Sequence, residues 1–183
     1  MKPALAVAIG ALLLLIVIAL PSAHPQIPSG REVVSPSAYV SLEPVARGSN
    51  FQLAVVLKIR PGFHINARKP SAEYLIPTDL RPTLPAGFKS AGEIAYPPGE
   101  LKTFAFSKTP LNVYADRVIL RLPLSAQPNA PLGAQHIPLK LHYQACNNEV
   151  CLPPVTLDVD AQLTVAANAA NSRPAHPELF PAH

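Results

Sequence analysis

Four stretches of the 183-residue sequence alternate apolar and polar side chains with a period of two. They are Phe51–Arg60, Arg117–Leu124, Gln135–Ala145 and Val155–Val165. Successive side chains of a β-strand point to opposite faces, so this alternation predicts strands with one buried face and one face in water. Because parallel sheets are normally covered on both faces, the pattern favours antiparallel sheets, packed as a sandwich.

Composition supports an all-β fold. Only 14% of the residues are charged, whereas Pro occurs 23 times, a balance that suits short strands and turns better than long helices. Pro123 and Pro138 lie inside predicted strands and cannot donate to a ladder, so we expect these strands at sheet edges or with bulges. The formal charge of +4 is scattered along the chain, which does not favour nucleic acid as a partner.

The N-terminal segment resembles an export signal. Lys2 precedes an uncharged apolar run from Ala4 to Leu20, so residues 1–23 are predicted to be a signal peptide or an N-terminal membrane anchor. No cysteine lies nearby to carry a lipid. Residues 24–37 and 166–183 lack periodicity and are predicted to be a linker and a flexible tail, which leaves one domain over residues 38–165.

Cys146 and Cys151 are the only cysteines, and they lie between the last two predicted strands. Export to an oxidising compartment predicts that they pair. The pair is either a structural staple or a disulfide that exchanges. A six-residue loop restrains the unfolded chain by only about 2 kcal/mol, against about 4 to 5 kcal/mol for a loop of a hundred residues, which weakens the first interpretation. The loop carries no basic residue to stabilise a thiolate, and Glu149 opposes one.

Metal binding is the competing chemistry at this pair. His142, with His64 or His136, could complete a ligand set with the two cysteines. Their spacing matches no standard zinc pattern, so we predict neither a metal site nor another cofactor.

The segment Ala91–Thr109 has no clean alternation and carries Tyr96, Phe104 and Phe106. An irregular segment of this kind either folds over a site or is a loop held by ordinary aromatic anchors.

The stretch YQACNNEVCLPPVTLDV resembles the active-site hairpin of the N-terminal periplasmic domain of the DsbD family of thiol:disulfide interchange proteins. RPGFHINARKP, EYLIPTDL and YPPGELKTFAFSKTPLNVYADRVILRLPL are also similar to that family, and the resemblance covers Tyr39–Val165. It implies an immunoglobulin-like antiparallel β-sandwich with a redox-active cysteine hairpin and a cap loop, located in the periplasm or cell envelope.

The resemblance also implies roles for particular residues. Cys151 would form a mixed disulfide with a partner, and Cys146 would resolve it. The cap loop would be Tyr96–Thr109, with Phe104 or Phe106 as its lid. The residues implied to line the site are His64, Asn66, Tyr143 and Glu149.

The implied partners are thioredoxin-like or DsbD-type membrane redox proteins and oxidised periplasmic proteins, including disulfide isomerases and cytochrome c maturation proteins. The sequence contains no C-x-x-C motif and neither the membrane segment nor the thioredoxin-like domain of full-length DsbD. We therefore expect separate proteins to supply the other steps of an electron relay. The alternative is a non-catalytic envelope binding module with a structural disulfide.

Overall fold

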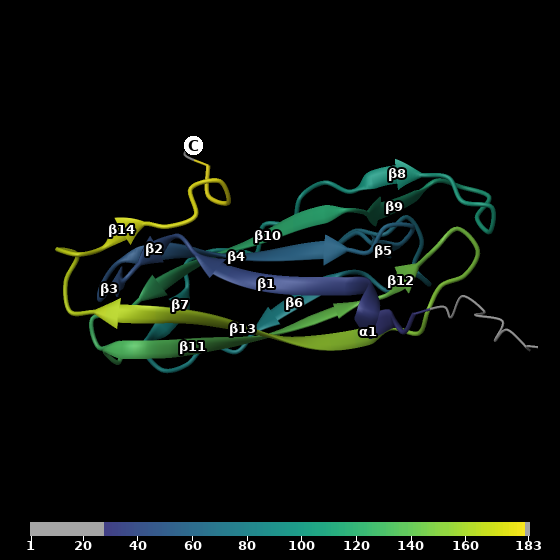
Figure 1. Ribbon diagram of the computed structural model, residues 1–183. Coiled ribbons are helices and arrows are strands. Elements are labelled where there is room, and N and C mark those ends of the chain that lie inside the picture. The colour runs from purple at the N-terminus through teal and green to yellow at the C-terminus, as the bar shows by residue number, and fades with distance from the viewer. Residues whose placement is uncertain (1–27, 182–183) are drawn as a thin grey trace, which may run out of the picture.

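The computed structural model describes residues 28–181, in which a single helical turn accompanies a series of β-strands (Figure 1). The elements of the first half are α1 (Gly30–Val33), β1 (Val34–Val40), β2 (Leu42–Glu43), β3 (Val45–Ala46), β4 (Asn50–Ile59), β5 (His64–Asn66), β6 (Asp79–Pro82) and β7 (Phe88–Ser90). Those of the second half are β8 (Glu100–Lys102), β9 (Leu111–Tyr114), β10 (Arg117–Ala126), β11 (Gly133–Tyr143), β12 (Ala145–Cys146), β13 (Val155–Ala166) and β14 (Arg173–Pro174).

Two four-stranded sheets pack face to face as a sandwich. Sheet I has the order β1-β4-β10-β7, and sheet II has the order β3-β13-β11-β6. Neighbouring strands are antiparallel except β3 and β13, which run parallel. The inward side chains of both sheets form one core, represented by Leu53, Leu120, Leu122, Leu139 and Leu141. The predicted all-β, immunoglobulin-like antiparallel sandwich is confirmed.

The alternation places the strands as predicted. In β10, Val118, Leu120 and Leu122 are buried while Arg117 is exposed. Strands β11 and β13 form the longest ladder, from Gly133 opposite Val165 to Tyr143 opposite Val155. The connection that carries the cysteines therefore lies at the end of a long antiparallel pair.

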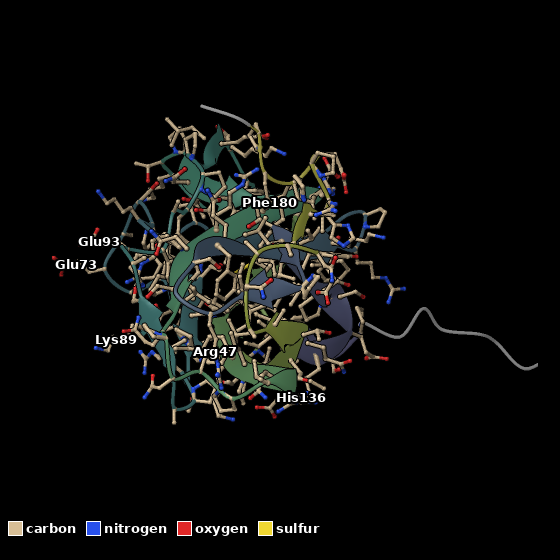
Figure 2. All side chains as sticks on the ribbon, turned by 90° about the vertical axis from the view of Figure 1, so that its left-hand side faces the viewer. Arg47, Glu73, Lys89, Glu93, His136 and Phe180 are labelled. Atoms are coloured by element: carbon tan, nitrogen blue, oxygen red, sulfur yellow. A yellow bond between two sulfur atoms is a disulfide. The ribbon has the colours of Figure 1, made fainter. Side chains whose placement is uncertain are left out.

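The prediction of a flexible tail at residues 166–183 is wrong for the part that the structure describes. Strand β14 pairs with β2, and Leu179 packs on the outer face of β4 against the buried Ala54 and Val56. The Nε of Arg121 donates a hydrogen bond to the carbonyl of Leu179 (2.7 Å). Figure 2 shows Phe180 on this segment, over the outer side of sheet I. Because the outer face of β4 is apolar here, it needs this cover.

The predicted linker at residues 24–37 also ends too late. Val33 and Val34 are buried, and β1 pairs with β4 from Val34 onward. The hydroxyl of Tyr143 donates a hydrogen bond to the carbonyl of Gly30 (2.7 Å), which fixes α1 to the end of β11. The predicted signal peptide or anchor lies outside the described residues. Among residues 28–181, no helix is long and apolar enough to cross a membrane.

The prediction of edge strands or bulges at the two prolines is wrong. The ladders run without a break through Pro123, opposite Gln52, and Pro138, opposite Asp160. Strand β10 lies between β4 and β7, and β11 lies between β13 and β6. Both prolines are tolerated because β7 and β6 are short: their ladders begin only at Leu124 and Leu139, one residue beyond each proline. The proline carbonyls still accept hydrogen bonds from the backbone amides of Ala91 and Thr83.

A third, smaller sheet lies at one end of the sandwich, on the right in Figure 1. Sheet III has the order β12-β5-β9-β8. One of its faces adds Ile65, Tyr114 and Ala145 to the main core. The other face carries Leu111 and Val113, which form a separate cluster with Leu75 and Phe104. The loops after β5 and β8 therefore cover the outer face of sheet III.

Candidate functional site

A disulfide joins Cys146 and Cys151 in the hairpin between β11 and β13. The S–S distance is 2.02 Å, and the two Cα atoms are 3.9 Å apart. The two residues also form an isolated antiparallel bridge. The sequence prediction placed the pair at a strand-to-strand connection, and the structure agrees.

Hydrogen bonds hold the hairpin independently of the sulfurs. The side-chain oxygen of Asn147 accepts from the backbone amides of Glu149 and Val150, each at 2.8 Å. The amide of Asn147 donates to the carbonyl of Val150, and that of Leu152 donates to the carbonyl of Ala145 (2.8 Å). Asn is well suited to such a turn because its side chain mimics a backbone acceptor. Sequence analysis missed Asn147, although Asn directly after the first cysteine was a signal for this turn.

The two cysteines differ in exposure. Cys146 is fully buried in β12, whereas Cys151 is half-buried and follows the exposed residues Asn148, Glu149 and Val150. Cys151 is therefore the more accessible of the two residues from solvent.

The register of β12 and β5 sets the neighbours of Cys146. Cys146 lies opposite His64, and Ala145 lies opposite Ile65. Because side chains alternate along a strand, Ile65 and Ala145 point into the main core, while His64 and Cys146 share the outer face of sheet III.

His64 is buried under an aromatic side chain. It is 4% exposed, and its ring stacks on that of Phe104 with a centroid distance of 4.0 Å and an angle of 18°. Its Nε2 has no hydrogen-bond partner among residues 28–181. Burial, with a contribution from the charge of Lys102, lowers the pKa of His64 to about 4. The imidazole is therefore neutral at pH 7.

Asn66 follows two residues later on the same face. Its side-chain nitrogen donates to the carbonyl of Ile76 (3.0 Å) and, at 3.4 Å, to the side-chain oxygen of Gln144. The hydroxyl of Thr78 donates to the carbonyl of Asn66 (2.6 Å). Asn66 is thus placed to hold the loop between β5 and β6 against the hairpin. Gln144 was not among the predicted site residues, although it adjoins the cysteine motif.

The segment 103–110, between β8 and β9, forms a lid over the outer face of sheet III. Phe104 is 8% exposed and belongs to the cluster with Leu75, Leu111 and Val113. Phe106 stacks on Phe104 with a centroid distance of 5.4 Å but remains 42% exposed. The two aromatic residues that sequence analysis treated alike therefore differ: Phe104 contacts His64, and Phe106 is partly in solvent.

Tyr96 belongs to a different region from the lid. Its ring packs against the main core, its hydroxyl accepts a hydrogen bond from the amide of Leu80 (2.9 Å), and the guanidinium of Arg68 lies over its face. Tyr96 lines an open groove of about 860 Å³ together with Arg68, Asp79 and Tyr114. Burial raises the pKa of Tyr96 above its usual value.

The remaining predicted site residues lie apart from the face that His64 and Cys146 share. Tyr143 points into the main core, where burial raises its pKa to about 12 and its hydroxyl holds Gly30. Glu149 lies in the hairpin but is exposed.

The histidines considered as metal ligands have other neighbours. The Nδ1 of His142 lies 2.9 Å from the hydroxyl of Thr156, and that of His136 lies 2.7 Å from a carboxylate oxygen of Asp160. In Figure 2 His136 lies on the side of the sandwich opposite Phe180. Over residues 28–181, no three His, Cys, Asp or Glu side chains are grouped as metal ligands.

Comparison with known proteins identifies a family over most of the chain. The family model described as "Thiol:disulfide interchange protein DsbD, N-terminal" matches residues 31–163. No curated protein matches the chain.

Among solved structures, the N-terminal periplasmic domain of ScsB from Proteus mirabilis matches with 16% identity and a TM-score of 0.44, over 74% of this chain and 49% of that chain. The chain thus spans about half the length of that ScsB domain structure. The CssB subunit of enterotoxigenic Escherichia coli colonization factor CS6, complemented with a donor strand from CssA, matches with 16% identity and a TM-score of 0.37, over 69% of this chain and 97% of that chain.

Proposed function

Because the chain belongs to the family of DsbD N-terminal domains, we propose that it exchanges disulfides with partner proteins through Cys146 and Cys151. The observation that carries this proposal is the unequal exposure of the two cysteine residues. Exchange requires access to one sulfur and a leaving group in the other. The half-buried Cys151 offers the first, and the buried Cys146 supplies the second.

The hydrogen bonds of the hairpin support a redox role over a purely structural one. Asn147 and the Leu152–Ala145 backbone bond already define the turn without the S–S bond. A short loop of this size contributes only about 2 kcal/mol through chain entropy. The site can therefore keep its shape when the disulfide is reduced, as an exchanging pair must.

The reaction has two steps. A partner thiolate attacks the sulfur of Cys151, the S–S bond breaks, and its electron pair leaves on the sulfur of Cys146 as a thiolate. The product is a mixed disulfide between Cys151 and the partner. The partner's second thiolate then attacks the partner's own sulfur in the mixed disulfide. Cys151 leaves as a thiolate, the partner becomes a disulfide, and the domain is left as a dithiol. The reverse sequence passes the two electrons to an oxidised partner, with Cys146 as the resolving thiolate.

The partners fit the family. We propose that thioredoxin-like or DsbD-type membrane redox proteins reduce the pair, and that oxidised periplasmic proteins receive the electrons. The compartment proposed is the periplasm or cell envelope, because a disulfide persists in such an oxidising environment. The stacked Phe104 is proposed to shield the pair until a partner displaces the lid.

Trapping tests the proposal. Cys146→Ser leaves Cys151 able to form a mixed disulfide that cannot be resolved, so incubation with an envelope extract should yield a covalent adduct that a reductant releases. Cys151→Ser is the matched control, because its remaining sulfur is buried and should give far less adduct. Equal trapping by both variants would contradict the assignment of Cys151.

The redox midpoint separates exchange from a structural disulfide. Equilibration of the purified domain in glutathione buffers should give a midpoint well above about −300 mV. A pair that stays oxidised over the whole range of these buffers would favour the alternative function, a binding module in which the disulfide only pins the hairpin.

A further inference from the structure

The outer face of sheet III brings one ionisable side chain directly opposite the buried cysteine. His64 and Cys146 form a cross-strand pair between β5 and β12. Such paired residues have Cβ atoms about 4.5 to 5.5 Å apart and side chains on the same side of the sheet. A modest rotation of either side chain can therefore bring the imidazole to the sulfur.

The imidazole has hydrogen-bonding capacity that the disulfide form does not use. Within the described part of the chain, the buried Nε2 of His64 has no partner. An unsatisfied polar atom in a protein interior is costly and is uncommon in native structures. The ring is held in this position by its stacking on Phe104, so it cannot turn out to solvent while the lid is closed.

Reduction creates the missing partner. When the S–S bond breaks, Cys146 carries a thiolate in a fully buried position, where it lacks water. A buried thiolate needs a hydrogen-bond donor or a positive charge. The titratable side chains on the surrounding elements are Glu100 and Lys102 of β8, Lys108 of the lid, Glu149 of the hairpin, and Arg68, Lys69, Glu73 and Tyr74 of the β5–β6 loop, all at least partly exposed. Tyr114 of β9 belongs to the main core, on the other face of sheet III. Glu100 lies 3.0 Å from Lys102 and offsets its charge.

We infer that His64 donates a hydrogen bond from Nε2–H to the sulfur of Cys146 whenever that sulfur is a thiolate, an inference that rests on the proposed exchange reaction. The same bond serves both directions. It stabilises the leaving thiolate when a partner attacks Cys151, and it holds the resolving thiolate when Cys146 attacks the mixed disulfide. Neither step requires His64 to gain or lose a proton, because the neutral imidazole of the disulfide form already carries one N–H.

Replacement of His64 tests this bond. His64→Phe keeps an aromatic ring for the stack on Phe104 but removes both nitrogens, whereas His64→Gln restores an N–H donor. In the Cys151→Ser background, the pH dependence of alkylation with iodoacetamide reports the pKa of the Cys146 thiol. His64→Phe should reduce the thiolate fraction at pH 7 about tenfold, and His64→Gln should recover at least half of that loss on a logarithmic scale.

An unchanged thiol pKa in His64→Phe would overturn the inference, and so would equal effects of Phe and Gln, since a packing role does not depend on a donor. Tautomer-sensitive ¹⁵N spectra of the reduced wild-type domain give a readout that needs no variant. They should show a proton on Nε2, and a proton on Nδ1 alone would overturn the inference.

The two proposals fail in different ways. A wild-type domain that does not equilibrate with glutathione removes the exchange function. If the wild-type domain equilibrates with glutathione and the His64→Phe variant has the same redox midpoint, only the role of His64 is removed.

Discussion

Phe104 provides the most direct test of whether the lid limits access to the cysteines. Its ring covers His64, which lies opposite Cys146, and it packs in the small cluster with Leu75, Leu111 and Val113. We predict that Phe104→Ala makes the Cys146 thiol more accessible without unfolding the sandwich. The main core contains none of the residues of this small cluster, so the effect should be local.

The size of the effect follows from burial. Phe→Ala in a fully packed core costs about 3 to 5 kcal/mol. Phe104 is 8% exposed and lies in a peripheral cluster, so we expect its removal to make the free energy of lid closure about 2 kcal/mol less favourable. If alkylation requires the lid to open, a change of about 2 kcal/mol increases the rate roughly thirtyfold.

The assay uses Cys151→Ser protein, in which Cys146 is the only thiol, and follows its alkylation at constant pH. Phe106→Ala is the matched control, because Phe106 is 42% exposed and stacks on Phe104 from the solvent side. Its rate should stay within about twofold of the parent. Urea unfolding of each variant checks that the sandwich remains folded.

Two results would refute this reasoning. An unchanged rate in Phe104→Ala would show that the stacked ring does not limit access to Cys146. Equal acceleration by Phe104→Ala and Phe106→Ala would show that the lid acts as a single unit, in which burial of the individual rings does not matter.

Two further predictions concern stability. The pKa of His64 is about 4 in the folded protein and about 6.5 in an unfolded chain, so the unfolded state binds more protons between these values. The free energy of unfolding should therefore be greatest above pH 6.5 and fall by about 2 kcal/mol towards pH 4, after allowance for solvent screening. Urea titrations at several pH values should show a weaker pH dependence of this free energy in His64→Gln than in the parent. An equal pH dependence in the two proteins would contradict the prediction. Leu179→Ala should lower the free energy of unfolding by about 2 to 3 kcal/mol, because Leu179 is 2% exposed against Ala54 and Val56, and it should leave the Cys146 alkylation rate unchanged. A stability equal to that of the parent would mean that the segment after β13 does not cover β4 in solution.

Local sequence pattern was sufficient for the main strands and for the place of the cysteines. Alternation in Arg117–Leu124 and Val155–Val165 predicted β10 and β13, because a period of two needs no information from elsewhere in the chain. The same reasoning failed at the two prolines. A proline is tolerated inside a sheet where the neighbouring strand is too short to pair with it, and the length of that neighbour is not visible in the local pattern. It failed again at the outer face of β4, where Ala54 and Val56 are apolar but their cover, Leu179, comes from the far end of the sequence.

The candidate site shows the same division. The amino-acid pattern was enough to place two cysteines in a short hairpin between two long strands, and a resemblance drew attention to His64, Asn66 and the aromatic residues. The fold was needed to show that Cys146 is buried and Cys151 half-buried, and that His64 lies opposite Cys146. It also separated Phe104, over the site, from Tyr96, which lines a groove elsewhere. Burial and side-chain pairing arise between strands distant in sequence, and the register between such strands is fixed by the packing of the whole fold.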